Sequence, residues 1–348
     1  MKKFYQYFSV FFLLFFIIIL FLINGFTTAY FNEIIQKKFY EKFPLVNIKF
    51  ENVTTSLNIK NLDLDLKLQN PNLSYKNKKI NLKKIEISTN IISFIKKEKK
   101  LKKNYFDLES AKIKDLIILK DLLNIKSLSK YSKKIKNGEI EGNFLINFDN
   151  IKEIESSGKI KNLSFEINKQ IPNFKNLNAN FSYKNALLKI ENVSANFLDL
   201  KVKNSEAKFK FSNPIERKFD SIILLSGKID KLFLLKDYVN FKLPIGLKNI
   251  NGNIDIDLKL KANLDNNFNF KEVKSNSQIK ISKANADYLF VSKNKKKKKN
   301  FKLKNINFTS KLINKIFTIQ GSLLLENYPF KYTLDKKIDS DNFISQIK

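Results

Sequence analysis

Apolar residues run without a break near the amino terminus and then change to strict alternation with polar residues. Residues 4–23 read FYQYFSVFFLLFFIIILFLI, and every side chain from Val10 to Ile23 is apolar. At about 1.5 Å rise per residue, a helix of about 20 residues is roughly 30 Å long, the thickness of the hydrocarbon core of a bilayer. The pattern therefore predicts one transmembrane helix, with the rest of the chain on one side of the membrane. The expected lipid-facing anchor residues are Phe11, Leu14, Ile17, Ile18, Leu20 and Phe21.

A cleaved secretory signal is the alternative interpretation of this run. Signal peptides have an apolar core of about 7–15 residues that ends at small residues. Here the run is longer, and residues 24–29 (NGFTTA) form a poor cleavage site. We therefore expect an uncleaved anchor over residues 1–27, with a short basic head at Lys2 and Lys3. These lysines favour only slightly a cytoplasmic amino terminus.

The next segment has helical spacing and is followed by strands. Tyr30, Phe31, Ile34, Ile35 and Phe39 fall on one side of a predicted helix over residues 28–43, which Pro44 ends. From Leu45 onward the period is two, which predicts strands with one apolar and one wet side. Such strands are typical of an antiparallel sheet. Asn70-Pro71-Asn72 predicts a turn of the chain after the first clear strand.

Three stretches carry the clearest alternation. Their apolar positions are Leu62, Leu64, Leu66 and Leu68, then Phe144, Ile146 and Phe148, then Ile254, Ile256, Leu258 and Leu260. Asp63-x-Asp65 and Asp255-x-Asp257 are then the wet side of these strands rather than paired catalytic or metal-binding carboxylates. The segment 140–148 (IEGNFLINF) also recurs as 250–258 (INGNIDIDL), and 175–178 (KNLN) as 304–307 (KNIN), which predicts repeated β units.

A sheet with one apolar face must cover that face. Helical patterns are scarce after residue 135, so a helix layer is not expected there. Two solutions remain: a second sheet packed on the first, or a long curled sheet whose apolar side forms an open groove filled by lipid acyl chains. On the second hypothesis, the apolar positions of the three alternating stretches line the groove by burial alone.

The order of these elements resembles the AsmA-like proteins of Gram-negative envelopes. The segments that carry the resemblance are 57–64 (LNIKNLDL), Asn70-Pro71-Asn72, 80–87 (INLKKIEI), 91–94 (IISF) and 108–113 (LESAKI). Segments 157–163 (SGKIKNL) and 243–254 (LPIGLKNINGNI) resemble in particular the YhdP-type branch, which is related to the TamB and chorein-type lipid-transfer proteins.

This resemblance implies a bacterial inner-membrane protein with a single-pass anchor and its bulk in the periplasm. It also implies a taco-like β-groove that moves phospholipid towards the outer membrane. The expected partners are phospholipids, the inner membrane, and an outer-membrane or envelope protein at the C-terminal end. The expected domains are the anchor (1–27), an AsmA-like N-terminal module (28–138) and repeated β-groove units (139–348). Members of that branch are longer, so the chain is expected to be a fragment or a short paralogue.

Composition narrows the chemistry. The chain contains no Cys and no His, which removes thiolate metal sites, Cys–His and Ser–His–Asp catalysis. We therefore expect no enzyme, no metal site and no cofactor. The net charge is +32, but Arg217 is the only arginine, and nucleic-acid interfaces favour arginine. We expect no nucleic-acid partner and interpret the run Lys295–Lys299 as a solvated loop between strands.

Two functions of different classes follow. The first is binding of acyl chains in a β-groove for phospholipid transport between the inner and outer membranes. The alternative is a membrane-tethered scaffold for outer-membrane protein assembly or envelope integrity, with sheets packed on each other and no lipid conduction. The predicted fold is mainly β: an N-terminal transmembrane helix followed by a long curled antiparallel sheet that forms an open, taco-like apolar groove, with a few short helices. The scaffold would instead need closed cores.

Overall fold

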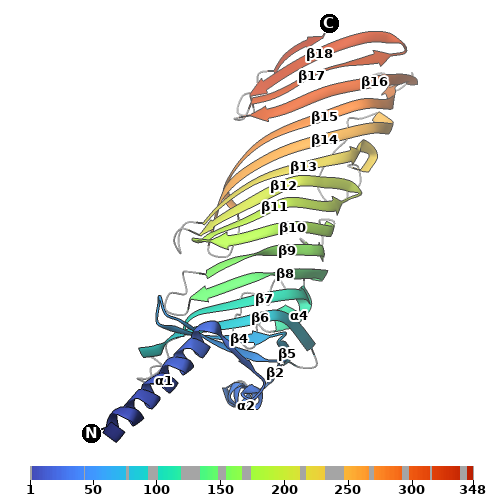
Figure 1. The fold of residues 1–348 in the computed structure, drawn as a ribbon. Coiled ribbons are helices and arrows are strands. Elements are labelled where there is room, and N and C mark those ends of the chain that lie inside the picture. Colours follow the sequence, from blue (N-terminus) through green and yellow to red (C-terminus); the bar gives the residue numbers. More distant parts are fainter. Residues whose placement is uncertain are drawn as a thin grey trace. The chain divides into compact units, whose positions relative to one another are not determined.

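The chain forms one long antiparallel sheet that is not closed, with few helices, which confirms the mainly-β prediction (Figure 1). The structure is a computed structural model, and it describes residues 2–42, 44–75, 78–92, 101–118, 134–147, 154–166, 174–211, 217–231, 247–265, 270–291, 298–313, 316–337 and 343–347. Contacts divide the chain into two units. Unit 1 comprises Met1–Ser132, Glu139–Lys159 and Ser182–Asn185, and unit 2 comprises Lys133–Gly138, Ile160–Phe181 and Ala186–Lys348.

Unit 1 contains the helices and the shorter strands. Its helices are α1 (Lys2–Asn24), α2 (Asn32–Lys42) and α4 (Ile113–Ile118). Its strands are β1 (Phe26–Thr28), β2 (Val46–Lys49), β3 (Val53–Asn58), β4 (Asp63–Gln69), β5 (Asn72–Tyr75), β6 (Lys78–Asn90) and β7 (Leu101–Lys112). Strands β8 (Ile135–Asn147), β9 (Ile154–Phe165) and β10 (Phe174–Lys184) are each divided between the two units.

Helix α2 begins later than the sequence predicts. Residues 26–28 pair with β3 as strand β1, so the segment expected to start a helix at Thr28 is partly extended. The hydroxyl of Thr28 then accepts a hydrogen bond from the backbone N–H of Tyr30 at 3.0 Å. The pairing with β3 keeps the chain extended here. The spacing of apolar residues cannot reveal such pairing with a distant strand.

The predicted turn at Asn70-Pro71-Asn72 is wrong. Gln69 pairs with Lys84 and Asn72 pairs with Asn81, so β4 and β5 follow each other along the same strand β6 in one register. Asn70 has a φ of 50°, which bends the strand, but its N–H still donates to Lys83 and the carbonyl of Pro71 accepts from Leu82, so the chain does not reverse. The result is a kinked strand rather than a hairpin.

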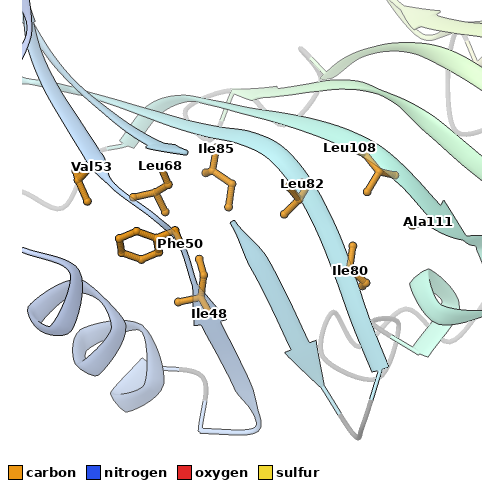
Figure 2. Packing of buried hydrophobic residues seen from close by; sticks show 9 residues of the cluster. All are labelled: Ile48, Phe50, Val53, Leu68, Ile80, Leu82, Ile85, Leu108 and Ala111. Atoms are coloured by element: carbon orange, nitrogen blue, oxygen red, sulfur yellow. The ribbon is translucent and has the colours of Figure 1, made fainter. Parts of the chain in front are cut away.

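The core of unit 1 lies between the sheet and its helices. Figure 2 shows the buried side chains gathered over one side of the strands, with Val53 fully buried. The buried cluster consists of Ile48, Phe50, Val53, Leu68, Ile80, Leu82, Ile85, Leu108 and Ala111. Ile35 and Phe39 of α2 and Leu116 of α4 pack against this cluster. Unit 1 therefore closes its apolar side with a second layer of helices.

Unit 2 continues as a meander of longer strands. They are β11 (Leu187–Phe197), β12 (Leu200–Phe211), β13 (Arg217–Lys228), β14 (Leu247–Leu264), β15 (Phe270–Val291), β16 (Lys298–Ile313), β17 (Ile316–Leu325), β18 (Tyr328–Lys337) and β19 (Phe343–Ile347). From β11 to β19, each strand pairs antiparallel with the next in the sequence. Figure 1 shows β14 and β15 as long, curved ribbons.

Candidate functional site

Strand register in unit 2 aligns apolar side chains in rows across the sheet. Ile256 of β14 pairs with Leu225 of β13 and Ile279 of β15, and in the next row Ile254 pairs with Ile281. Because residues two apart point to the same side of a strand, these rows form one surface. We call it the apolar face: Ile223, Leu225, Gly227, Ile254, Ile256, Leu258, Ile279, Ile281, Phe308, Leu312, Phe317, Ile319, Gly321, Tyr332 and Leu334.

The opposite surface of the same strands is polar. Asp255 pairs with Lys280, which in turn pairs with Thr309 of β16, and Thr309 pairs with Gln320 of β17. Asp255, Lys280 and Gln320 are exposed. From β14 to β16 the register keeps the charged side chains on this side of the sheet. The separation is not complete, because β13 adds Ile222 and Leu224 to the polar side and Ser277 and Ser310 lie among the apolar rows.

The apolar face is partly open in the described part of unit 2. The elements that pack extensively there are strands adjacent in the sheet, and no helix or second sheet lies on the face among the described residues. Ile254 and Ile281 are buried, at 2% and 7% exposure, in a cluster with Leu200, Ala284 and Ile229, the last from the short 3-10 turn that follows β13. Ile256, Leu258 and Ile279 remain partly exposed. This surface is the candidate site. Because its side chains are mainly apolar, it can bind hydrocarbon by burial.

A line of backbone irregularities crosses the strands of unit 2. On seven strands one residue other than glycine has a φ near +50°: Asn162, Asn176, Asn192, Asn204, Asn249, Lys283 and Asn305. The register shifts in the ladders of β11, β12, β14, β15 and β16 fall at or next to these residues, apart from one further shift between Ala262 and Leu264 of β14. Bulges of this kind bend a strand and increase its twist. Asparagine suits them because its short polar side chain tolerates the left-handed conformation.

Side-chain hydrogen bonds stabilise the bulges of β15 and β16. Asn307 Nδ2 donates to the backbone oxygen of Asn305 at 2.9 Å, and Asn307 Oδ1 accepts from the backbone N–H of Lys283 at 3.0 Å. In return, Asn285 Oδ1 accepts from the backbone N–H of Asn305 at 3.1 Å. The backbone donors that the bulges remove from the ladder are thereby satisfied.

The same arrangement occurs between β9 and β10. Asn178 Nδ2 donates to the backbone oxygen of Asn176, and Asn178 Oδ1 accepts from the backbone N–H of Asn162, each at 3.0 Å. Ser164 Oγ accepts from the backbone N–H of Asn176 at 3.4 Å. The two recurring KNLN and KNIN segments thus have one local conformation.

Replacing Asn305 by valine should destabilise the protein by about 1–2 kcal/mol, because a β-branched residue is strained at a φ of 50°. Asn305→Gly should be nearly neutral, since glycine adopts this conformation freely. Thermal unfolding of the full-length variants, followed by circular dichroism, measures the difference. Equal unfolding temperatures for the two variants would contradict the role assigned to this bulge.

In unit 1, the predicted groove residues divide among three environments. Leu62 lies in the turn before β4 with a φ of 52° and is 48% exposed, so its place on the strand is wrong. The alternating pattern includes Leu62 because this residue has the spacing of β4, although the strand itself begins only at Asp63. Leu68 belongs to the buried core and Leu66 packs against it, while Leu64 is partly exposed.

The remaining predicted residues lie on β8 and β14. Phe144 packs against the core of unit 1, and Ile146 is partly exposed. Phe148 lies outside the described residues. On β14, Ile254 is buried, and Leu258 and Leu260 are partly exposed on the same side of the strand. Thus, of the predicted residues, only those on β14 lie on the apolar side of unit 2. Ile254, Ile256 and Leu258 belong to the apolar face, and Leu260 continues the same side between Ser221 and Ser275.

Helix α1 carries the predicted anchor residues on its surface. All six are more than two-fifths exposed: Phe11, Leu14, Ile17, Ile18, Leu20 and Phe21. Within the part of the chain that the structure describes, no helix reaches the length and apolarity required to cross a membrane.

Shallow hollows lie on the polar side of the described strands, and two of them are lined by charged residues. A hollow of about 320 Å³ is lined mainly by polar and charged side chains, among them Lys218, Lys261 and Lys274. A smaller hollow of about 150 Å³ includes Asp257, whose Oδ1 is buried without a hydrogen-bond partner in the structure, and Lys259. Among the described residues, no three acidic side chains gather in a way that could hold a metal ion.

Titration shifts lie away from these hollows. Burial raises the pKa of Glu86, but hydrogen bonds and charge from Lys67 and Lys84, at 2.9 and 3.0 Å, outweigh it and leave that pKa below its usual value. Burial at the edge of the apolar face raises the pKa of Tyr332. Both shifts have structural causes and define no catalytic pair.

No protein-family model, curated protein or solved structure matches the chain.

Several residues of the apolar face were not among the predicted site residues. Leu225, Phe308 and Leu312 enter the face through their pairing with neighbouring strands. Alternation identifies each of them as a strand residue. It does not show which strands pair, because pairing depends on hydrogen bonds between separate segments of the chain. Ile279 and Ile319, by contrast, stand in clear alternating pairs with Ile281 and Phe317, and this signal could have included them.

Proposed function

We propose that this protein binds lipid acyl chains on the apolar face of unit 2 and takes part in phospholipid transport between the membranes of a bacterial envelope. The observation that carries the proposal is the apolar face, which spans several strands without a second layer among the described residues. A contiguous apolar surface beyond a few hundred Å² is rare on soluble proteins unless it binds something. An acyl chain fits because each buried CH₂ contributes about 0.8 kcal/mol.

Attachment to the inner membrane through α1 is part of the proposal. The uninterrupted apolar run from Val10 to Ile23 and the exposure of its side chains support it. The resemblance to AsmA-like proteins adds the periplasmic location and the direction towards the outer membrane. Burial of hydrocarbon requires no catalytic group, so the function proposed is transport without chemistry.

A membrane-tethered scaffold is the second candidate, and the closed core of unit 1 favours it. There the apolar side of the sheet is covered by α2 and α4, as in an ordinary structural domain. The two candidates differ in what unit 2 carries: a scaffold needs no lipid on the apolar face.

Native mass spectrometry of the purified full-length protein tests the proposal. We expect phospholipid to remain bound after exchange into a mild detergent, and we expect extraction with organic solvent to recover it. Protein whose mass is that of the bare chain, under conditions in which a known lipid carrier retains its cargo, would reject lipid binding and favour the scaffold.

A further inference from the structure

Helix α2 uses only one of its sides to pack on unit 1. Ile35 and Phe39 contact the buried core, and Asn32 Nδ2 donates to the backbone oxygen of Glu51 at 2.8 Å. Ile34 and Tyr40 are 54% and 52% exposed and lie on the two flanks of the outward side, about 120° apart around the helix axis, with Glu33, Lys37 and Glu41 between them. The apolar positions that helical spacing placed on one face are therefore divided between core and surface.

Apolar and aromatic side chains next to α2 are exposed as well. Tyr30 is 81% exposed and Leu45 is 64% exposed, at the two ends of α2. The rings of Tyr30 and Phe31 meet edge to face with their centroids 5.5 Å apart. We call the surface the outer patch: Tyr30, Phe31, Ile34, Tyr40 and Leu45.

The chain holds the outer patch close to the end of α1. Only residues 25–31 separate Asn24, the last residue of α1, from Asn32, the first of α2. Seven residues reach at most about 25 Å even when fully extended. Strand β1 within this connection pairs with β3, and α1 contacts β3 as well. The outer patch and the exposed end of α1 are therefore tied to the same strand.

The composition of the patch matches the border between hydrocarbon and water. Tyrosine is enriched at membrane interfaces, where its ring is buried and its hydroxyl stays wet. The exposed charges of α2 are Glu33, Lys37, Lys38 and Glu41, and Lys38 Nζ pairs with Glu41 at 3.1 Å. Lys37 remains available for anionic headgroups, which attract lysines near the membrane surface.

We propose that the outer patch lies in the headgroup region of the membrane that holds α1, so that unit 1 rests directly on the bilayer. This inference rests on the proposed function in one respect, the insertion of α1. A lipid surface is the occupant because the short connection 25–31 and the contacts of α1 and β1 with β3 hold the patch near the end of α1, and because the patch carries interfacial tyrosines. The contact orients the sheet relative to the bilayer instead of leaving it on a loose tether.

Single-tryptophan fluorescence tests the contact, because the chain contains no Trp. Full-length Tyr30→Trp and Tyr40→Trp variants are reconstituted in vesicles of phosphatidylethanolamine and phosphatidylglycerol that carry bromine at defined acyl positions. Phe15→Trp reports on α1, and Tyr328→Trp, at a 71% exposed position of unit 2, is the control. Far-UV circular dichroism verifies that each variant is folded.

For Tyr30→Trp and Tyr40→Trp, we expect blue-shifted emission and the strongest quenching by shallow bromines, at a depth of about 5–10 Å from the headgroup boundary. Tyr328→Trp should show neither effect. If Phe15→Trp is quenched while Tyr30→Trp and Tyr40→Trp behave like Tyr328→Trp, the outer patch is free and this inference is rejected, whereas the anchor stands. Quenching of Tyr40→Trp without quenching of Phe15→Trp would show a membrane contact without an inserted α1, which rejects both the anchor and the inference as stated. Loss of both signals rejects both.

Discussion

Replacing Leu258 by lysine is expected to reduce the capture of acyl chains at least about tenfold, because placing an ammonium group against hydrocarbon costs more than the roughly 1.4 kcal/mol that a tenfold change represents. Leu258 is partly exposed on the apolar face, between Ile223 and Ser277. The measurement is the yield of covalent adduct between the full-length protein in its membrane and a phospholipid with a photoreactive acyl chain.

Asp255→Lys is the matched control for this change. It introduces the same side chain on the same strand, three residues away, but on the exposed polar face. Its adduct yield should stay within about a factor of two of the unaltered protein, since surface substitutions change free energies by about 0.5 kcal/mol or less. Equal losses from both lysines would mean that lipid does not bind on the apolar face.

Gly252→Ala is expected to destabilise the protein by about 2–5 kcal/mol, the combined cost of backbone strain and overpacking. Gly252 has a φ of 140°, and a Cβ there would lie 2.5 Å from the Cα of Ala284 on β15. Neither backbone can withdraw without breaking the ladder between β14 and β15. Chemical unfolding of the full-length protein, followed by circular dichroism, measures the loss.

Gly227→Ala separates this strain from the mere loss of a glycine. A Cβ at Gly227 also has a short contact, 2.6 Å, but to Cδ2 of Leu200 at the end of a flexible side chain. Rotation of that side chain should limit the cost to about 1–3 kcal/mol. A Gly252→Ala variant no less stable than Gly227→Ala would contradict the strain assigned to position 252.

Alternation made the strands predictable because each side of the sheet has its own environment. Along β14, Ile254, Ile256 and Leu258 lie on one side, and Asp255 and Lys259 point to solvent. A period of two can hardly arise from any other structure, so both the strand and its two sides follow from the residues. The antiparallel sheet follows in turn, since a doubly covered strand would show no polar side.

In unit 1, the pairing between strands could not be predicted from the sequence. The pattern around Asn70 and Pro71 contains two turn-forming residues, and only the register along β6 shows that the strand continues past them. Leu62 keeps the spacing of β4 although its backbone has already left the strand. In both cases a partner strand decides what a local signal means.

Helix α2 illustrates a second limit. Its apolar residues occupy more of its circumference than one neighbour can cover, so spacing alone does not say which of them is buried. Ile35 and Phe39 are partly buried because they contact the cluster around Ile48 and Phe50, whereas Ile34 and Tyr40 remain exposed to solvent. The candidate site has the same origin: the apolar face exists only because several alternating strands share a register.

Pairing of each strand with its successor, from β11 to β19, has a consequence for how such a protein can change in size. An added hairpin would need to match only the strand it joins, as in solenoids, where stability is close to a sum of neighbour terms. Low contact order should also let the meander form progressively as the polypeptide becomes available. Length would then be an adjustable property, gained or lost by whole hairpins without redesigning a shared interior.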